Sequence, residues 1–254
     1  MIGFSNAKIN IGLSVLDKRP DGFHNLKSIF YPIPLNDIIE IQKSDKDSFD
    51  SYPIQLSDNN LITQARDLLR SRYHFGPVSI VIHKQIPLGS GLGGGSSNAV
   101  TTLKILINLF ELDISDSELF EVTLELGSDC PFFLKNSPQE VSGRGDLLQD
   151  SNLSLKEKYI ALINPGIHIS TAEAFSNLTK RQGKPEMNSW TFLSNDFQAA
   201  AERDYPAIKE ALDELNDLGA IFTSLSGTGS TVYGIFDSLV DFKTGANRWL
   251  FQLD

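Results

Sequence analysis

Five glycines lie within seven residues of this chain, between Gly89 and Gly95, and two serines follow them. Glycine accepts positive φ and carries no side chain, so the amide N–H groups of such a run can touch an anion. The run therefore indicates a phosphate-binding loop, although a flexible linker is the plain alternative. The whole segment reads Pro87, Leu88, Gly89, Ser90, Gly91, Leu92, Gly93, Gly94, Gly95, Ser96 and Ser97.

The elements predicted on either side of this segment argue against a linker. Alternating apolar residues over 78–86 predict a strand that leads straight into the glycines. Beyond them, apolar residues from Ala99 to Phe110 recur at helical spacing. A helix that starts at the glycines directs its N-terminal dipole at a bound anion. Ser96 and Ser97 could cap that helix, touch phosphate or reach a metal ion.

Known kinds of phosphate loop differ in the residues that accompany the glycines. A Walker A loop needs a Lys after its last glycine, and none is present. Protein kinases need His-Arg-Asp and Asp-Phe-Gly motifs, which are absent. The spacing of Gly89, Gly91 and Gly94 matches a dinucleotide fingerprint, but Glu111 and Asp113, at the required distance, end a predicted helix rather than a strand. A dinucleotide-binding oxidoreductase stays open as an alternative.

Composition limits the partners of this chain. Its formal net charge of −10 opposes sequence-independent nucleic-acid binding, which needs many cationic contacts to phosphates. No apolar stretch is long enough to span a membrane. Cys130 is the single cysteine, which we expect to be a buried small residue rather than a nucleophile. Since the N-terminus also lacks the features of a signal peptide, we expect a cytoplasmic enzyme with a small-molecule substrate.

Further strands and helices follow from periodicity and from capping residues. Asn59 or Asn60, Ser115 and Ser170 are predicted helix caps, and Pro206 is predicted to start a helix that Gly219 ends. Polar residues over 42–51 predict a loop. A polar stretch near 150–157 is the predicted boundary between domains 1–155 and 156–254. Strands are predicted at 9–15, 23–33, 38–41, 159–163, 220–226 and 230–236.

Two more motifs flank the glycine segment in the chain, Ala7-Lys8-Ile9-Asn10 before it and Ser226-Gly227-Thr228-Gly229-Ser230 after it. Together the three resemble, in the correct order, the motifs of the GHMP kinase superfamily. The resemblance implies an ATP-dependent small-molecule kinase with Mg²⁺. It also implies an α+β fold of two domains, with a ribosomal-protein-S5-like N-terminal half and a ferredoxin-like C-terminal half. ATP would be held by 87–97 and by Gly227, Thr228 and Gly229.

Residues 19–24 and 126–133 narrow the resemblance to one branch of that superfamily. Its substrate is a cytidine diphosphate conjugate of a methylerythritol, phosphorylated on the 2-hydroxyl in the non-mevalonate isoprenoid pathway. Phe23 stands where that branch usually has Tyr, and Ser128 and Cys130 stand where Ala and Val are common. A homoserine- or mevalonate-type kinase is the alternative within the superfamily.

The resemblance also implies catalytic roles. Asp129 would be the base that accepts the proton of the attacking hydroxyl, and Lys8 would be its partner. Asn10 would share a strand face with Lys8 and hold the substrate. The plain alternatives are an exposed loop aspartate and a solvated lysine.

The same resemblance implies a site for the cytosine base. Phe23 and Phe175 would stack on the ring, and His24 would read its edge by hydrogen bonds. Core packing is the alternative for the two phenylalanines. Asn195 precedes a predicted helix, and its pattern indicates only a helix cap.

Overall fold

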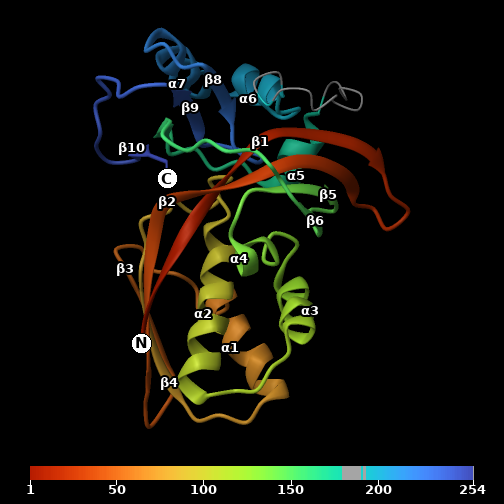
Figure 1. The fold of residues 1–254 in the computed structure, drawn as a ribbon, viewed down its shortest axis with the longest axis vertical. Coiled ribbons are helices and arrows are strands. Elements are labelled where there is room, and N and C mark those ends of the chain that lie inside the picture. Colours follow the sequence, from red (N-terminus) through yellow and green to blue (C-terminus); the bar gives the residue numbers. More distant parts are fainter. Residues whose placement is uncertain (179–189, 191–192, 254) are drawn as a thin grey trace. The chain divides into compact units, whose positions relative to one another are not determined.

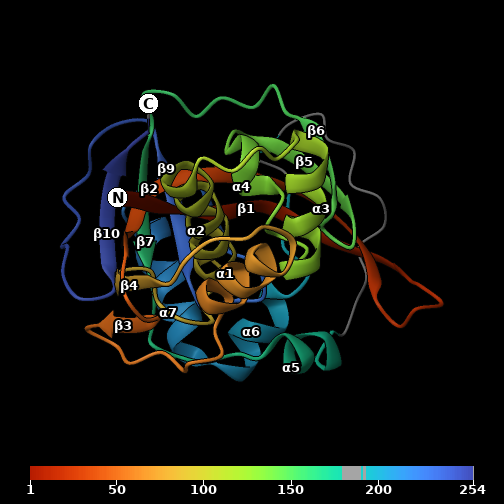
Figure 2. The ribbon, with the colours of Figure 1, turned by 90° about the horizontal axis from the view of Figure 1, so that it is seen from below.

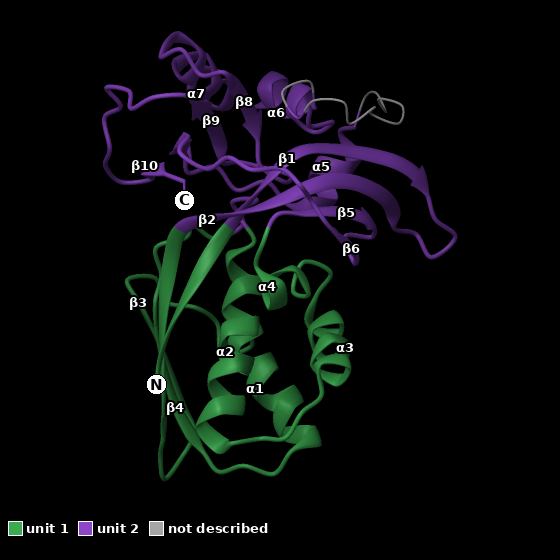
Figure 3. Cartoon of the chain, in the orientation of Figure 1, with its two compact units in different colours: residues 1–7, 35–88, 93–137 green, residues 8–34, 89–92, 138–254 purple. Residues whose placement is uncertain are grey.

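The computed structural model describes residues 1–178, 190 and 193–253. It divides into two compact units, neither of which is one continuous segment (Figure 3). Unit 1 comprises Met1–Ala7, Leu35–Leu88 and Gly93–Ser137, and unit 2 comprises Lys8–Pro34, Gly89–Leu92 and Pro138–Asp254. The strands β1 (Ile2–Lys18) and β2 (His24–Lys43) each contribute residues to both units. The boundary predicted at residue 155, between domains 1–155 and 156–254, stays a prediction.

Unit 1 consists of strands of one sheet and of helices. The central strand β4 (Val78–His83) runs antiparallel to Ile38–Lys43 of β2 and parallel to β3 (Ser48–Tyr52). Its side chains alternate between buried and more exposed, as period-two patterning requires. The helices α1 (Leu61–Arg72) and α2 (Gly94–Phe110) lie side by side in Figure 1 and Figure 2. The unit also contains α3 (Asp116–Leu126) and α4 (Phe132–Lys135).

Local capping explains where the predicted helices begin. The side chain of Asn60 accepts hydrogen bonds from the N–H groups of Ile62 and Thr63, and the N–H of Asn60 donates to Thr63 Oγ1. Ser115 accepts from the N–H of Glu118 as the cap of α3. The helix predictions at both positions are confirmed.

Unit 2 contains a second sheet, with the order β10-β7-β9-β8 and all neighbours antiparallel. That order is the ferredoxin-like one, and it confirms the predicted fold. Its strands are β7 (Tyr159–Ile163), β8 (Phe222–Leu225), β9 (Val232–Phe236) and β10 (Arg248–Gln252). Between β7 and β8 the chain forms the helices α5 (Thr171–Ser176), α6 (Gln198–Asp204) and α7 (Pro206–Asp217). The described residues between β9 and β10 form no helix, so the helical layer comes from one connection only.

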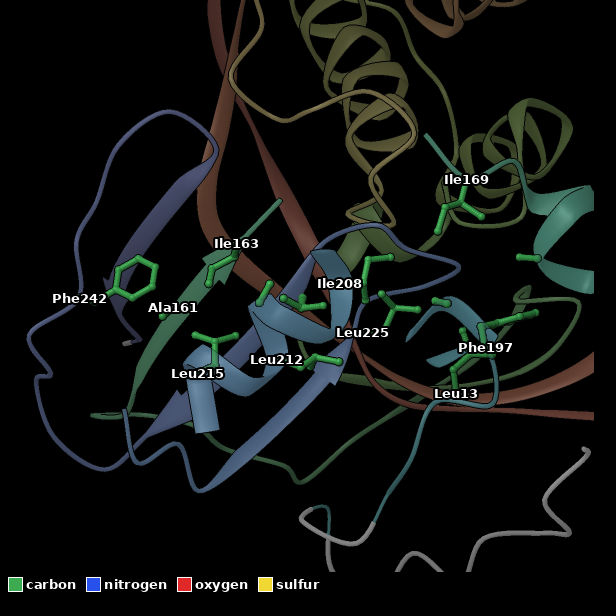
Figure 4. Packing of buried hydrophobic residues seen from close by; sticks show 14 of the residues in the cluster. Leu13, Ala161, Ile163, Ile169, Phe197, Ile208, Leu212, Leu215, Leu225 and Phe242 are labelled. Carbon is green, nitrogen blue, oxygen red and sulfur yellow. The ribbon is translucent and has the colours of Figure 1, made fainter. Parts of the chain in front are cut away.

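The core of unit 2 lies between this sheet and α7. Ile208, Leu212 and Leu215 recur along one face of α7 and are buried in one cluster with Leu225 and Phe197 (Figure 4). Pro206 occupies the first turn of the helix, as predicted, where its missing N–H costs no hydrogen bond.

Two strand predictions need correction. The segments predicted as separate strands at 23–33 and 38–41 are one strand, β2. It pairs with β5 (Gln139–Gly143) through 26–30 and with β4 through 38–43, so Pro32 and Pro34 lie between the stretches of β2 that these two ladders use. The predicted loop over 42–51 contains most of β3, an edge strand whose polar side chains are compatible with partial exposure.

The strand β6 (Leu147–Asp150) completes the pairing beside β5. Among the described residues, no helix has the length and apolar character that a membrane crossing requires.

Candidate active site

A buried carboxylate fixes both flanks of the glycine loop (residues 87–97) within unit 1. Asp37 is fully buried, and its Oδ1 accepts from the N–H groups of Gln85 at 2.7 Å and Ile86 at 2.9 Å. Its Oδ2 accepts from Lys84 Nζ and, at 2.9 Å, from Asn98 Nδ2. One side chain therefore ties the end of β4, before the loop, to the first turns of α2, after it. No local pattern in the sequence points to this role.

The N-terminus of α2 has no side-chain cap. Gly93 is the capping residue, at φ +68°, and it makes no side-chain cap hydrogen bond. Of the roles considered for Ser96 and Ser97, capping is therefore not observed; the buried Ser97 hydroxyl instead accepts from Ser5 Oγ at 2.8 Å. An uncapped helix N-terminus leaves donors and a positive partial charge for an anion.

Within unit 2, the glycine loop touches the third motif. Gly91 has φ +77°, and a Cβ built on it would lie 2.0 Å from the carbonyl oxygen of Ser226. The hydroxyl of Ser226 donates to the carbonyl of Gly91 at 2.9 Å, and the N–H of Thr231 donates to the carbonyl of Ser90 at 3.2 Å. The structure thus brings together two motifs that are 135 residues apart in the chain.

The first motif, Ala7-Lys8-Ile9-Asn10, also binds to the glycine loop and to Ser226 of the third motif. The N–H of Lys8 donates to the carbonyl of Leu92 at 2.9 Å, and the N–H of Asn10 donates to Ser226 Oγ at 3.3 Å. Lys8 is only 3% exposed, which rules out a solvated lysine. Its Nζ donates to Asn10 Oδ1 and lies 4.3 Å from the ring centroid of Phe30. The prediction that Lys8 and Asn10 share one face of β1 is confirmed.

Asp129 lies in unit 1, in the turn between α3 and α4. Its neighbour Cys130 is fully buried, and burial raises the pKa of the thiol to about 12, against the smaller opposing effect of a hydrogen bond with Ser96. The charge of Asp129 raises this pKa further. Cys130 is therefore a buried thiol and not a nucleophile, as predicted. Because Lys8 belongs to unit 2, its approach to Asp129 stays a prediction.

The residues predicted to bind cytosine form two pairs in unit 2, and Phe175 also packs edge-on against the buried Phe197, with ring centroids 4.9 Å apart. The rings of His24 and Phe175 are stacked, with centroids 4.9 Å apart and 18° between their planes. The other pair is Phe23 and Arg144, whose guanidinium carbon lies 5.2 Å from the centroid of the Phe23 ring. Phe23 is 55% exposed and is not core. Phe175 thus faces His24 and not Phe23, and Arg144 is a neighbour that no sequence pattern indicated.

Two family models match the chain on either side of its middle. The model described as "GHMP kinases N terminal domain" matches residues 60–136, and the one described as "GHMP kinases C terminal" matches residues 173–252. The first range contains the glycine loop and Asp129, and the second contains the third motif. The chain belongs to the GHMP kinase family. It is a small-molecule kinase, and that family implies ATP as a substrate.

Individual relatives narrow the class. A curated relative from Bacteroides thetaiotaomicron, named 4-diphosphocytidyl-2-C-methyl-D-erythritol kinase, is 41% identical over 99% of both chains. A crystal structure of 4-(cytidine 5'-diphospho)-2C-methyl-D-erythritol kinase is 28% identical, with a TM-score of 0.81 over 92% of this chain and 90% of the other. A mevalonate kinase structure, at 16% identity and a TM-score of 0.63 over 93% and 91%, shares the fold.

Proposed function

We propose that this chain transfers the γ-phosphoryl group of ATP to the 2-hydroxyl of 4-diphosphocytidyl-2-C-methyl-D-erythritol. The single observation that carries the proposal is the 41% identity to a kinase of that name over 99% of the chain. The mevalonate- or homoserine-type alternative has only fold-level similarity in its support, and the dinucleotide-binding oxidoreductase has none. We also propose a cytoplasmic location, which stays a prediction.

The glycine loop and the N-terminus of α2 are proposed to hold the phosphates of ATP. The N–H groups of Gly94, Gly95 and Ser96 begin an uncapped helix and would donate to phosphate oxygens. The turn of Gly227, Thr228 and Gly229 follows Ser226, whose hydroxyl is bonded to Gly91, and is proposed to close over the same phosphates. Binding here would position the γ-phosphoryl group, and positioning is most of what phosphoryl transfer asks of a protein.

Asp129 and Lys8 are proposed to carry the chemistry. The 2-hydroxyl oxygen of the substrate would form a bond to the γ-phosphorus, while the bond between the γ-phosphorus and the β-phosphate oxygen breaks. The Asp129 carboxylate would accept the hydroxyl proton during this step. The Lys8 ammonium would stabilise negative charge on the oxygens in transfer. Its bond to Asn10 Oδ1 holds the ammonium in one place, so little reorganisation is needed during the reaction.

Mg²⁺ is proposed to accompany ATP and to neutralise its phosphate charge. Within the described ranges, no group of three or more His, Cys, Asp or Glu side chains could hold a metal ion. Mg²⁺ keeps several waters and is bound largely through substrate phosphates, so the proposal does not require such a group. Ser97 is a poor ligand, since its hydroxyl is buried and bonded to Ser5.

Phe23, His24 and Phe175 are proposed to bind the cytosine ring. Phe23 is the exposed member, and its ring can stack on a base without rearrangement of a core. The ring of Phe175 is stacked on His24. To contact the base directly, Phe175 would have to lose this stacking contact. Otherwise His24 would lie between the Phe175 ring and the base, and Phe175 would support the site indirectly.

The test is a coupled ADP-release assay with the purified chain, ATP and Mg²⁺. We expect turnover with 4-diphosphocytidyl-2-C-methyl-D-erythritol and none with mevalonate or homoserine; the reverse pattern would overturn the substrate assignment. Asp129→Asn should lose turnover by at least about a hundredfold and retain binding of a non-hydrolysable ATP analogue. The exposed Asp113→Asn is the matched control, and equal rates for both variants would refute the role of Asp129 as a base.

A further inference from the structure

Asn195 is not the helix cap that its pattern predicted. The helix α6 begins at Gln198 with Phe197 as its N-cap and has no side-chain cap. Asn195 is 4% exposed, and its Oδ1 accepts from the N–H of Phe197 at 2.9 Å, just before the helix. Its Nδ2 donates to two other groups, the carbonyl oxygens of Leu225 and Gly227, each at 2.8 Å. These carbonyls flank Ser226 on both sides. The N–H of Phe197 alone would need only an acceptor, which Asp or Ser supplies as well.

The backbone around Asn195 is itself fixed against β1. The N–H of Leu13 donates to the carbonyl of Ser194 at 2.9 Å, and the N–H of Asp196 donates back to the carbonyl of Leu13 at 2.8 Å. Asp196 Oδ2 also accepts from the N–H of Val15 at 2.7 Å. Asn195 therefore projects its amide from a segment with little freedom to move.

The group that Asn195 holds is the junction of the three sequence motifs in unit 2. Ser226 Oγ donates to the carbonyl of Gly91 and accepts from the N–H of Asn10. A Cβ built on Gly227 would lie 3.1 Å from the Cα of Gly91, so the two backbones are already in contact. A shift of the 226–229 turn would therefore change the position of the Gly89–Leu92 segment.

We propose that Asn195 is a positioning residue of the nucleotide site: its amide fixes the 226–229 turn against Gly89–Leu92. The inference rests on the proposed role of the glycine loop in binding ATP. The hydrogen bonds of the Asn195 side chain join it to backbone groups, so it acts through Ser226 and the loop. Both halves of its amide are needed, since Oδ1 accepts from the N–H of Phe197 while Nδ2 holds the turn. This double requirement explains why the position carries Asn.

The test is the nucleotide affinity of Asn195→Asp, measured by titration with a non-hydrolysable ATP analogue. The variant keeps the size and the acceptor for the N–H of Phe197 but turns a carboxylate oxygen toward two carbonyls. Each lost hydrogen bond is worth up to about tenfold in an equilibrium constant, so we expect affinity to fall at least about tenfold. The KM for ATP should rise by a similar factor, and the KM for the alcohol should change less than about twofold.

A pH series adds a signature that loss of packing cannot produce. A protonated carboxyl group can donate one hydrogen bond, and burial beside carbonyls raises its pKa. Relative to the wild type, the affinity of Asn195→Asp should therefore recover as the pH falls, whereas that of Asn195→Ala should not. The absence of any difference between the two variants across this series would count against a donor role.

Gln198→Leu is the matched control. Gln198 Oε1 accepts from the N–H of Leu225 at 3.0 Å, so its loss disturbs the same strand without touching the 226–229 turn. Its nucleotide affinity should stay within about twofold of the wild type. Equal losses in Asn195→Asp and Gln198→Leu, wild-type affinity in a folded Asn195→Asp, or failure of every Asn195 variant to fold would each overturn the proposal. A wild type that binds the analogue but does not phosphorylate the cytidine conjugate would refute only the proposed function.

Discussion

Gly91→Ala should damage the nucleotide site more than any other single methyl group in the loop. Gly91 has φ +77°, in the left-handed region, where an L-residue is disfavoured by roughly 1–2 kcal/mol. The added Cβ would also lie 2.0 Å from the carbonyl oxygen of Ser226, and real Cβ atoms essentially never come closer than 3.0 Å. One of the two backbones must therefore move by about 1 Å.

The cost of this movement can be worked from the contacts at the loop. The displacement would open the hydrogen bond from Ser226 Oγ to the Gly91 carbonyl, whose net worth is about 1 kcal/mol. With the backbone term, we expect the free energy of unfolding to fall by about 2–3 kcal/mol. Activity should fall further, because a 1 Å misplacement of positioning groups can cost about a hundredfold in rate.

The assay pairs chemical denaturation with ADP release, and the control is Gly166→Ala. Gly166 has φ +74°, but a Cβ built there meets nothing within 4 Å. Both variants carry the same backbone penalty, so the difference between them isolates the contact with Ser226. We expect near wild-type turnover from a folded Gly166→Ala. Wild-type turnover in Gly91→Ala would refute the reasoning, since the loop would then accept the displacement that the structure forbids.

Three further predictions concern other parts of the molecule. Asp37→Asn removes the charge that faces the buried Lys84 ammonium, so the free energy of unfolding in urea should fall by about 3–5 kcal/mol. Phe175→Leu removes the ring stacked on His24, so steady-state kinetics should show the KM for the cytidine conjugate up to about tenfold higher, with the KM for ATP unchanged. The pKa of Cys130, raised by burial to about 12, keeps the thiol protonated at pH 8, so mass spectrometry should detect no iodoacetamide labelling until the protein unfolds.

A specific experimental result would contradict each of these three predictions. If Asp37→Asn is as stable as the wild type, the carboxylate does not brace the loop; adding Lys84→Met should restore part of the loss, since it removes the unpaired charge. For Phe175, the partly exposed Phe120→Leu is the control, and an equal effect on the two KM values would place Phe175 outside the substrate site. Rapid labelling of folded protein would show that Cys130 is not buried in solution.

Local patterns predicted what depends on neighbours in the chain. The cap at Asn60, the start of α7 at Pro206 and the alternation of β4 each follow from interactions within a few residues. The glycine loop was also readable, because positive φ and close backbone approach demand glycine itself. The family resemblance then supplied the fold, which periodicity alone does not determine.

Long-range partners could not be read from the sequence. Asp37 meets Lys84 and Asn98 across 47 and 61 residues, and an Asp within a strand carries no mark of such a role. Asn195 fitted a cap pattern, but α6 has no side-chain cap, and the hydrogen bonds of the Asn195 amide nitrogen depend on residues at least 30 positions away. The pairing of Phe175 with His24 was missed for the same reason. Side chains of this kind are defined by the fold and not by their neighbours.

The interleaved composition of the two units has a consequence for how the protein is made. Every segment of unit 1 has been synthesised once the ribosome passes Ser137, but unit 2 joins Lys8–Pro34 to residues near the C-terminus. Asn10 binds Ser226 and Tyr233, 216 and 223 residues further on. At 5–20 residues per second, its strand waits roughly 10–45 s for these partners. The brace between Lys8, the loop and the third motif therefore cannot form before residues 226–233 are made, so a nascent chain stays inactive until then.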